Sequence, residues 1–353
     1  MNKRIIIIGA GPTGLGAAYR LNELGYPNWT LYEKNDHVGG LSASFTDEQG
    51  FTWDLGGHVL FSYYPYFDNL VENLLGERYI EHQRECWIHL KNRWVPYPFQ
   101  NNIRYLDPED QLDCLIGLAE VWKTKPEAEN FADWIKETFG NGIARLFMLP
   151  YNFKVWATPL ERMDRCWISE RVSVVDFKRV LENVIMARED SNWGPNNTFK
   201  YPLKGGIGAL FEAFVPLIKS HLVLPKEVES IDTSRKTIKF TDGSTDNYDY
   251  LINTMPLDKL IGLIEPENTS AVKAAENLHH NGVLVVGIGL KKPTTGTKCW
   301  SYFPEKDVPF YRVTNFSFYS PWNVPERDLS TYSSFLCETS FSQHKKEDES
   351  TIV

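Results

Sequence analysis

The sequence has few cysteines and no long apolar run. Its 353 residues include five cysteines, an odd number, which are scattered and never spaced as Cys-x-x-Cys. This usage is typical of a reducing compartment and disfavours both a disulfide framework and a zinc site. The longest apolar stretches, residues 5–8 and 283–290, fall short of the roughly 18 residues that a membrane span needs. We therefore expect a cytoplasmic protein that has no membrane partner.

Basic residues are also in deficit. The chain carries 37 Lys and Arg against 46 Asp and Glu, a net charge of −9, whereas a general nucleic-acid binder usually shows the opposite balance. The histidines show no metal-ligand spacing, and His279 and His280 are adjacent rather than four residues apart. The sequence thus predicts no nucleic-acid partner and no metal. Any anionic ligand would have to be held by locally placed arginines.

Aromatic residues, by contrast, are plentiful. The chain has 20 Phe, 17 Tyr and 11 Trp, which together make 14% of its residues. This is more than an ordinary core requires, so some of the rings are available to line a ligand site. The hydrophobic content of 42% and the charged content of 24% are typical of a globular protein. At roughly 150 residues per domain, the length predicts two or three domains.

The N-terminal region predicts a βαβ unit. Residues 4–10 are typical of a buried strand, 13–24 of a helix and 29–33 of a second strand, which together favour an α/β fold with a doubly wound sheet. Residues 105–188 have apolar side chains at helical spacing, which predicts an inserted helical domain. Further strands are predicted at 221–224, 228–231, 237–240, 248–253, 283–290 and 310–318, with a hairpin turn at Asp242-Gly243.

A GxGxxG motif lies at the first turn of the βαβ unit. Gly9, Gly11 and Gly14 follow a predicted strand and open a predicted helix, where glycine allows the backbone to approach a pyrophosphate. Glu33 ends the next predicted strand, where a carboxylate can accept hydrogen bonds from ribose hydroxyls. The arrangement predicts a dinucleotide site; the alternative is a glycine-rich turn that binds nothing.

The next segment favours a flavin over a nicotinamide. Gly39 and Gly40 form one glycine pair, and Gly56 and Gly57 form another within Asp-Leu-Gly-Gly-His at 54–58. Paired glycines would let two further loops approach a large planar ligand. This pattern resembles the FAD-binding segment of amine-oxidase and mutase-like flavoproteins. Leu41 stands where amine oxidases commonly carry arginine, which favours the mutase-like group.

Longer motifs then narrow the resemblance. They are GGHVLF (56–61), WVPYPFQNN (94–102), LFMLPYNFKVW (146–156), ERV (170–172), NWGPN (192–196) and KCWSY (298–302) with FYR (310–312). In these motifs, in their order and over essentially its whole length, the chain resembles the eukaryotic-type UDP-galactopyranose mutases. The resemblance implies an isomerase that interconverts UDP-galactopyranose and UDP-galactofuranose through a covalent bond between N5 of reduced FAD and the sugar anomeric carbon. The alternatives are an FAD-dependent oxidoreductase of the amine-oxidase type and a non-catalytic relative.

The resemblance also implies a domain division. It assigns residues 1–85 and 200–282 to a discontinuous, Rossmann-like FAD-binding domain. It assigns 103–199 to a helical substrate domain, and 86–102 with 283–353 to an antiparallel-sheet domain. Family members continue past position 353 with a segment that completes the sheet and returns to the flavin. We therefore expect a truncated product, a part of a larger protein or a shortened relative.

The residues that the resemblance implies fall into three groups. The FAD-binding residues are Gly9, Gly11, Pro12, Thr13, Gly14, Glu33, Lys34, Gly39, Gly40, Leu41, Gly56, Gly57, His58, Val228 and Met255. The substrate-binding residues are Phe61, Tyr97, Phe99, Gln100, Phe147, Met148, Asn152, Trp156, Arg171, Asn196, Trp300, Tyr302 and Arg312. The catalytic residues are His58, whose loop lies against the isoalloxazine in the family, together with Arg171 and Arg312.

Elementary chemistry agrees with these assignments. A diphosphate requires planar bidentate donors, which Arg171 and Arg312 can supply, although a lone arginine is more often a surface or ion-pair residue. Uracil requires a stacking face and an amide-like partner, which Tyr97 and Gln100 can supply, although an aromatic residue is more often part of a core. Asn196 and Trp300 match residues that face the galactose.

The family's eukaryotic branch typically reduces its FAD with NADPH, so we expect NADPH as the reductant. Arg84 and Tyr97 are the candidates for contact with it. Cys86 stands where the family would have a small polar residue. The sequence leaves open whether NADH replaces NADPH and whether the protein is a homo-oligomer.

Overall fold

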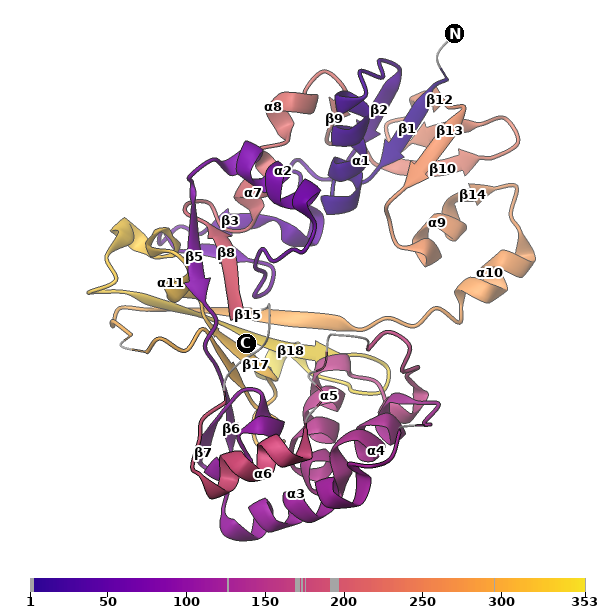
Figure 1. Cartoon of the computed structure of the whole chain (residues 1–353). Coiled ribbons are helices and arrows are strands. Elements are labelled where there is room, and N and C mark those ends of the chain that lie inside the picture. Colours follow the sequence, from indigo (N-terminus) through magenta and orange to yellow (C-terminus); the bar gives the residue numbers. More distant parts are fainter. Residues whose placement is uncertain are drawn as a thin grey trace. The chain divides into compact units, whose positions relative to one another are not determined.

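The computed structural model describes residues 3–125, 127–168, 172, 174, 176–190, 197–294 and 296–352 (Figure 1). The chain divides into two compact units. Unit 1 comprises Met1–Ile80 and Tyr201–His279, and unit 2 comprises Glu81–Lys200 and His280–Val353. The chain passes between them three times: within β5 (Tyr79–Gln83), within β8 (Thr198–Pro202) and after His279. β5 and β8 form a two-stranded sheet. The finer three-domain division stays a proposal.

The βαβ unit predicted at the N-terminus is confirmed in unit 1. A parallel sheet has the strand order β13-β1-β2-β9, and α1 packs on β1 and β2. The elements are β1 (Ile5–Ile8), α1 (Pro12–Glu23), β2 (Trp29–Tyr32), β9 (Leu222–Val223) and β13 (Tyr250–Asn253). The four successive isoleucines of β1 suit a central strand, because such a strand is buried on both faces.

A second sheet in unit 1 has the order β12-β11-β10-β14. It contains β10 (Val228–Asp232), β11 (Thr237–Phe240), β12 (Thr245–Asn247) and β14 (Ile264–Glu265). The predicted hairpin turn is confirmed, since Gly243 has a positive φ of 82° and its amide donates to Phe240 O at 2.9 Å. The other elements are β3 (Ser44–Thr46), β4 (Thr52–Asp54), α2 (Pro65–Leu75), α7 (Gly208–Glu212), α8 (Val215–Ile218), α9 (Leu257–Leu263) and α10 (Thr269–Ala275).

Unit 2 contains a six-stranded sheet of order β15-β18-β17-β16-β6-β7. Its strands are β6 (Cys86–Leu90), β7 (Arg93–Pro96), β15 (Gly282–Leu290), β16 (Trp300–Tyr302), β17 (Arg312–Asn315) and β18 (Ser333–Phe341). The strand predicted over 310–318 is too long, because β17 ends at Asn315 and is followed by the short helix α11 (Phe316–Tyr319). The aromatic residues of that helix are largely buried, so packing overrides their preference for strands.

The helices predicted between 105 and 188 are confirmed. They are α3 (Pro108–Val121), α4 (Phe131–Ile143), a π-helix (Ala144–Met148), α5 (Leu149–Trp156) and α6 (Phe177–Ile185), with α12 (Glu349–Ile352) near the C-terminus. The closest approach between α3 and α4 occurs at Gly117 and Gly140. A Cβ on Gly140, whose φ is +71°, would lie 2.2 Å from the Gly117 carbonyl carbon. Only glycine at position 140 permits this packing.

A buried carboxylate links elements of unit 1 that are far apart in the sequence. Asp54, at the end of β4, is 2% exposed and accepts hydrogen bonds from Ser44 Oγ (2.5 Å), Tyr201 Oη (2.7 Å) and Ile207 N (3.0 Å). These donors come from β3, β8 and the segment before α7. Asp54 thus joins parts of the chain that are about 150 residues apart in sequence, with a separation of 153 for Ile207.

Burial raises the pKa of Asp54 to about 6, although its three donors act in the opposite direction. Since the folded pKa lies above the ordinary 3.8, the folded protein holds this proton more tightly, and Asp54's contribution to stability falls as pH rises from about 4 to about 6. Asp54→Asn removes the titration. Urea titrations give the free energy of unfolding of each protein, and the quantity to follow is the wild-type value minus the variant value. We expect this difference to fall by on the order of 3 kcal/mol between about pH 4 and about pH 7. A constant difference would contradict this.

Candidate functional site

The glycine loop between β1 and α1 is tightly closed. Gly9 has a φ of +96°, and a Cβ on it would lie 2.6 Å from Thr254 Oγ1. A Cβ on Gly14 would lie 1.8 Å from Gly9 O, which no side chain could tolerate. Gly11 precedes α1 without a side-chain cap, and Pro12 occupies the first turn. The loop therefore requires glycine and leaves the helix N-terminus without a capping side chain, as dinucleotide binding requires.

Glu33 and the second glycine pair adjoin this loop. The Glu33 side chain accepts hydrogen bonds from Ala10 N (2.7 Å) and from Asn35 N and Nδ2 (2.9 Å each), and the residue is 7% exposed. Gly39 N donates to Ala10 O at 2.8 Å. Gly40 has a φ of +53°, and its Cβ would lie 3.2 Å from Gly11 Cα. Unit 1 thus brings together the three sequence-distant parts of the predicted cofactor site.

The third predicted loop also lies in unit 1. Gly56 has a φ of +136°, and its carbonyl accepts from His58 N at 2.8 Å. His58 itself is half-buried, and Gly57 is buried. Of the other predicted FAD residues, Pro12, Thr13 and Lys34 are exposed, as is Leu41. Val228 and Met255 pack against the core cluster of β1, β2, β10 and β11.

These residues fit FAD. The backbone approaches would be closed by any Cβ, and a buried carboxylate follows the second strand, which together form the cradle that a dinucleotide needs. Within the described residues, no group of three or more His, Cys, Asp or Glu side chains could hold a metal ion.

The predicted substrate rings gather in unit 2. Ring centroids are 4.8 Å apart between Phe99 and Phe147, 4.9 Å between Phe147 and Tyr151, 5.3 Å between Tyr151 and Tyr302, and 5.6 Å between Tyr302 and Tyr97. Phe99 and Phe147 are almost fully buried, whereas Tyr97 and Tyr151 are half-buried. The phenylalanines therefore support the tyrosines from behind rather than offering a face to a ligand.

Sequence reasoning missed Tyr151. It contacts both Phe147 and Tyr302 and so joins the predicted rings of the helical segment to those of the sheet. Its spacing of four residues from Phe147 was the available signal, because residues i and i+4 share a helix face.

Burial keeps these phenols neutral. It raises the pKa of Tyr97 to about 12 and raises the pKa values of Tyr151 and Tyr302 well above 10.0. The tyrosine hydroxyls of this cluster are therefore protonated at neutral pH and available as hydrogen-bond donors.

Arg312 lies beside these rings. It pairs in register with Tyr302 on one neighbouring strand and with Glu338 on the other, so the three side chains share one face of the sheet. Its Nη2 donates to Glu338 Oε1 at 2.6 Å, and its Nε donates to Oε2. Arg312 Cζ lies 5.9 Å from the centroid of the buried Trp300, and Arg84 Cζ lies 4.9 Å from that same ring.

The remaining predicted substrate residues are more dispersed. Gln100 and Met148 are buried, Asn152 Nδ2 donates to Met148 O at 2.7 Å, and Trp156 packs on Trp167 at 5.0 Å. Phe61 belongs to unit 1, where it packs edge-on against Tyr63 at 4.7 Å. Arg171 and Asn196, with most of the motifs at 170–172 and 192–196, lie outside the described residues.

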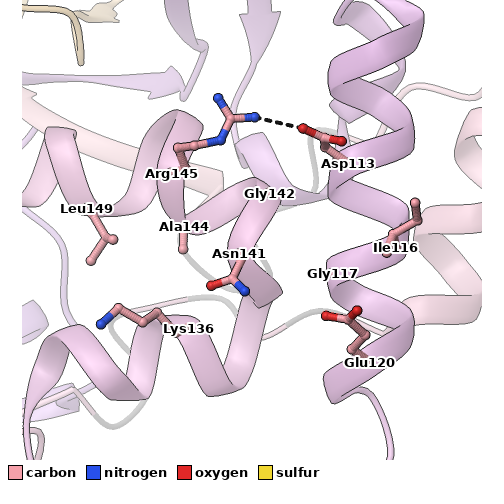
Figure 2. A pocket seen from close by; sticks show the side chains of 10 residues that line it. All are labelled: Asp113, Ile116, Gly117, Glu120, Lys136, Asn141, Gly142, Ala144, Arg145 and Leu149. Carbon is pink, nitrogen blue, oxygen red and sulfur yellow. Dashed lines mark hydrogen bonds and ion pairs between the residues drawn. The ribbon is translucent and has the colours of Figure 1, made fainter.

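A separate hollow of about 490 Å³ lies between α3, α4 and the π-helix (Figure 2). It is lined by Asp113, Ile116, Gly117, Glu120, Lys136, Asn141, Gly142, Ala144, Arg145 and Leu149. None of these is a predicted FAD or substrate residue. Arg145 and Asp113, which line it, pair with each other at 2.9 Å. The hollow is not the candidate site.

The glycine cradle is testable with a matched pair of variants. Gly14→Ala places a Cβ against Gly9 O, whereas Gly16, two residues further along α1, has nothing within 4 Å of its Cβ position. We expect Gly14→Ala to bind FAD at least roughly tenfold more weakly and Gly16→Ala to bind it normally. Flavin absorbance per protein after gel filtration measures this. Equal flavin content in the two variants would rule out the cradle.

Comparisons with known proteins agree with this geometry. A family model of flavin-containing amine oxidoreductases matches residues 12–350. The crystal structure of a reduced UDP-galactopyranose mutase is 45% identical, with a TM-score of 0.93 over 99% of this chain and 77% of its own. A putative protoporphyrinogen oxidase from Exiguobacterium sp. 255-15, 16% identical, shares the fold with a TM-score of 0.71 over 97% of this chain and 78% of its own.

A shorter stretch of the chain is similar to a second enzyme. The 4,4'-diaponeurosporene oxygenase of Staphylococcus haemolyticus (strain JCSC1435) is 45% identical over 69 residues, which is 19% of this chain and 13% of the oxygenase. That stretch is too short a part of the oxygenase to carry its activity.

No helix in the described part of the chain is long and apolar enough to cross a membrane. The family model and the mutase structure, by contrast, each match nearly the whole chain. The chain therefore belongs to the flavin-containing amine oxidoreductase family and, within it, to the UDP-galactopyranose mutases.

Proposed function

We propose that the chain interconverts UDP-galactopyranose and UDP-galactofuranose as an FAD-dependent isomerase. The observation that carries this proposal is the 45% identity to a reduced UDP-galactopyranose mutase, sustained over 99% of the chain. The assignment to the eukaryotic type rests on the long motifs of the sequence. A cytoplasmic location and a homo-oligomeric state stay predictions.

The cofactor is held by unit 1. The glycine loop at 9–14, Glu33, Gly39-Gly40 and the segment 56–58 bind FAD, with the pyrophosphate against the start of α1. When bound and reduced, FAD supplies the nucleophile for the anomeric carbon. By the family resemblance, the loop that carries His58 would lie against the flavin ring.

Unit 2 supplies the groups for the nucleotide sugar. Tyr97 and Tyr302 offer an aromatic face and neutral hydroxyl donors to the uridine. Arg312 and Arg171 hold the diphosphate, which carries the negative charge of the departing UDP, and so stabilise the transition state of bond cleavage. Asn196 and Trp300 match residues that face the galactose in the family, and Trp300 is 3% exposed in this structure. The buried rings behind the tyrosines keep water away from the site.

The family model also favours a second candidate, an FAD-dependent amine oxidation. This reaction oxidises its substrate and releases peroxide, whereas the mutase reaction consumes no net electrons. An arginine beside an aromatic cluster suits an anionic nucleotide better than a cationic amine, because guanidinium N–H groups donate hydrogen bonds to an anion and can accept none from an ammonium group. We therefore place the mutase reaction first.

The activity can be measured directly. Purified protein with FAD and dithionite should convert UDP-galactofuranose into UDP-galactopyranose. Anion-exchange chromatography separates the two sugars and measures the conversion. Full retention of reduced flavin without conversion would refute the mutase proposal. Peroxide release during incubation of the oxidised protein with primary or secondary amines would support the alternative.

Arginine substitutions test the diphosphate assignment. Arg312→Ala and Arg171→Ala should each lower kcat/KM at least roughly 100-fold, since each removes charge-assisted hydrogen bonds that form to the diphosphate. The matched control is Arg235→Ala, because the Arg235 side chain is 86% exposed in unit 1. Turnover by the site variants that equals that of the control would exclude the two arginines from the site.

NADPH is the proposed physiological reductant. Arg84, whose guanidinium stacks on Trp300, is the candidate to bind its phosphate groups. Arg84→Ala should slow flavin reduction by NADPH at least roughly tenfold and leave reduction by dithionite unchanged, measured by stopped-flow loss of flavin absorbance. Equal slowing with both reductants would instead indicate a damaged flavin site.

A further inference from the structure

Glu338 is a buried carboxylate on β18, the strand between β15 and β17 in the six-stranded sheet. It lies on β18 directly opposite Arg312 on β17, and its side chain is 4% exposed against 24% for the arginine. The arginine is therefore reachable from outside, whereas the carboxylate lies beneath it. A carboxylate so deeply buried persists only with strong hydrogen-bonding partners.

The contact occupies one edge of the guanidinium. Nε and Nη2 of Arg312 both donate to Glu338, and within the described part of the chain these are the hydrogen bonds of that guanidinium. The side edge is thus used, whereas the second N–H of Nη2 and one N–H of Nη1 form the end edge, which is also bidentate. That edge can still bind a second anion.

Neighbouring groups fix the pair in place. Tyr311 Oη donates to Glu338 Oε1 at 3.3 Å, and Tyr311 N donates to Glu338 O at 2.9 Å. The rings of Trp300 and Tyr311 lie 5.9 and 5.8 Å from Arg312 Cζ. Burial lowers the pKa of Arg312, but the neighbouring Glu338 carboxylate more than offsets this, so the pKa lies well above its ordinary value. The arginine stays charged and in one orientation.

We propose that Glu338 is the positioning residue of Arg312: it holds the side edge of the guanidinium so that the end edge faces the diphosphate of the nucleotide sugar. The inference rests on the proposed function in taking a UDP-sugar as the ligand. Glu338 touches no substrate atom in this role. Its effect on binding passes through Arg312, which distinguishes it from a carboxylate that merely stabilises the sheet.

The test is UDP binding to the FAD-loaded protein, measured by calorimetry. In Glu338→Gln, one amide N–H faces an arginine N–H, so the guanidinium turns away and the Kd for UDP should rise 10- to 100-fold. Glu338→Asp, which keeps the charge, should recover most of this loss. In an Arg312→Ala background, Glu338→Gln should change the UDP Kd less than twofold, because the residue through which Glu338 acts is gone.

The control is Asp110→Asn. Asp110 is another buried carboxylate of unit 2, 7% exposed, and it accepts from Lys91 Nζ at 2.6 Å away from the rings of the site. This variant should lose stability but bind UDP normally. An unchanged UDP Kd in Glu338→Gln would overturn the proposal. If that variant loses FAD, the comparison of Arg312→Ala with Arg312→Ala/Glu338→Gln decides, and a further tenfold loss in the double variant would overturn it.

The two proposals fail separately. If the wild-type protein binds UDP and Glu338→Gln weakens this binding, but no sugar is converted, the mutase function fails and the role of Glu338 stands. If the wild type converts the sugar and Glu338→Gln has normal UDP affinity and kcat/KM, the function stands and the role of Glu338 fails. Absence of UDP binding in the wild type would overturn both.

Discussion

The pairing of β17 between β16 and β18 decides which side chains of unit 2 face one another. Paired residues on neighbouring strands share a face, so this one register sets Tyr302, Arg312 and Glu338 in a row. A slip by one residue would turn Arg312 to the opposite face and leave Glu338 buried without its partner. The register is therefore specified by the ion pair as well as by the apolar residues. The side chains proposed to bind the nucleotide sugar depend on this register for their positions.

Unit 1 depends on a different constraint, the close approach of backbone segments. Gly14 meets the carbonyl of Gly9, and Gly40 meets Gly11, at distances that leave no room for a side chain. Asp54 stabilises the same unit by linking β3, β8 and the segment before α7. In the proposed function the two units have separate tasks: the close backbone approaches of unit 1 suit a dinucleotide, and the side chains of unit 2 are the proposed partners of a nucleotide sugar.

The cofactor cradle could be predicted from the sequence because residue type carries its chemistry. Gly9 and Gly14 leave no room for a Cβ, so the spacing of Gly9, Gly11 and Gly14 is a direct signal of the geometry. Glu338 could not be found in this way, because it lies 26 residues from Arg312 in the sequence. Only the pairing of β17 with β18 brings the two side chains together. The same holds for the end of β17, where burial of residues 316–319 outweighs local strand preference. Local rules predict local contacts, and the ion pair is not one of them.

The charge of the pair has a consequence for ligand binding. Arg312 and Glu338 together are neutral, and the protein as a whole carries −9, so Arg312 attracts an anion through directed N–H groups rather than through net charge. Neutralisation makes the buried arginine tolerable without a ligand, at the expense of long-range attraction. A doubly negative diphosphate must then find its net positive partner elsewhere, and Arg171 is the candidate that the sequence offers. The proposal therefore gives the two arginines different roles: Arg312 would set the orientation of the diphosphate, and Arg171 would supply the compensating charge.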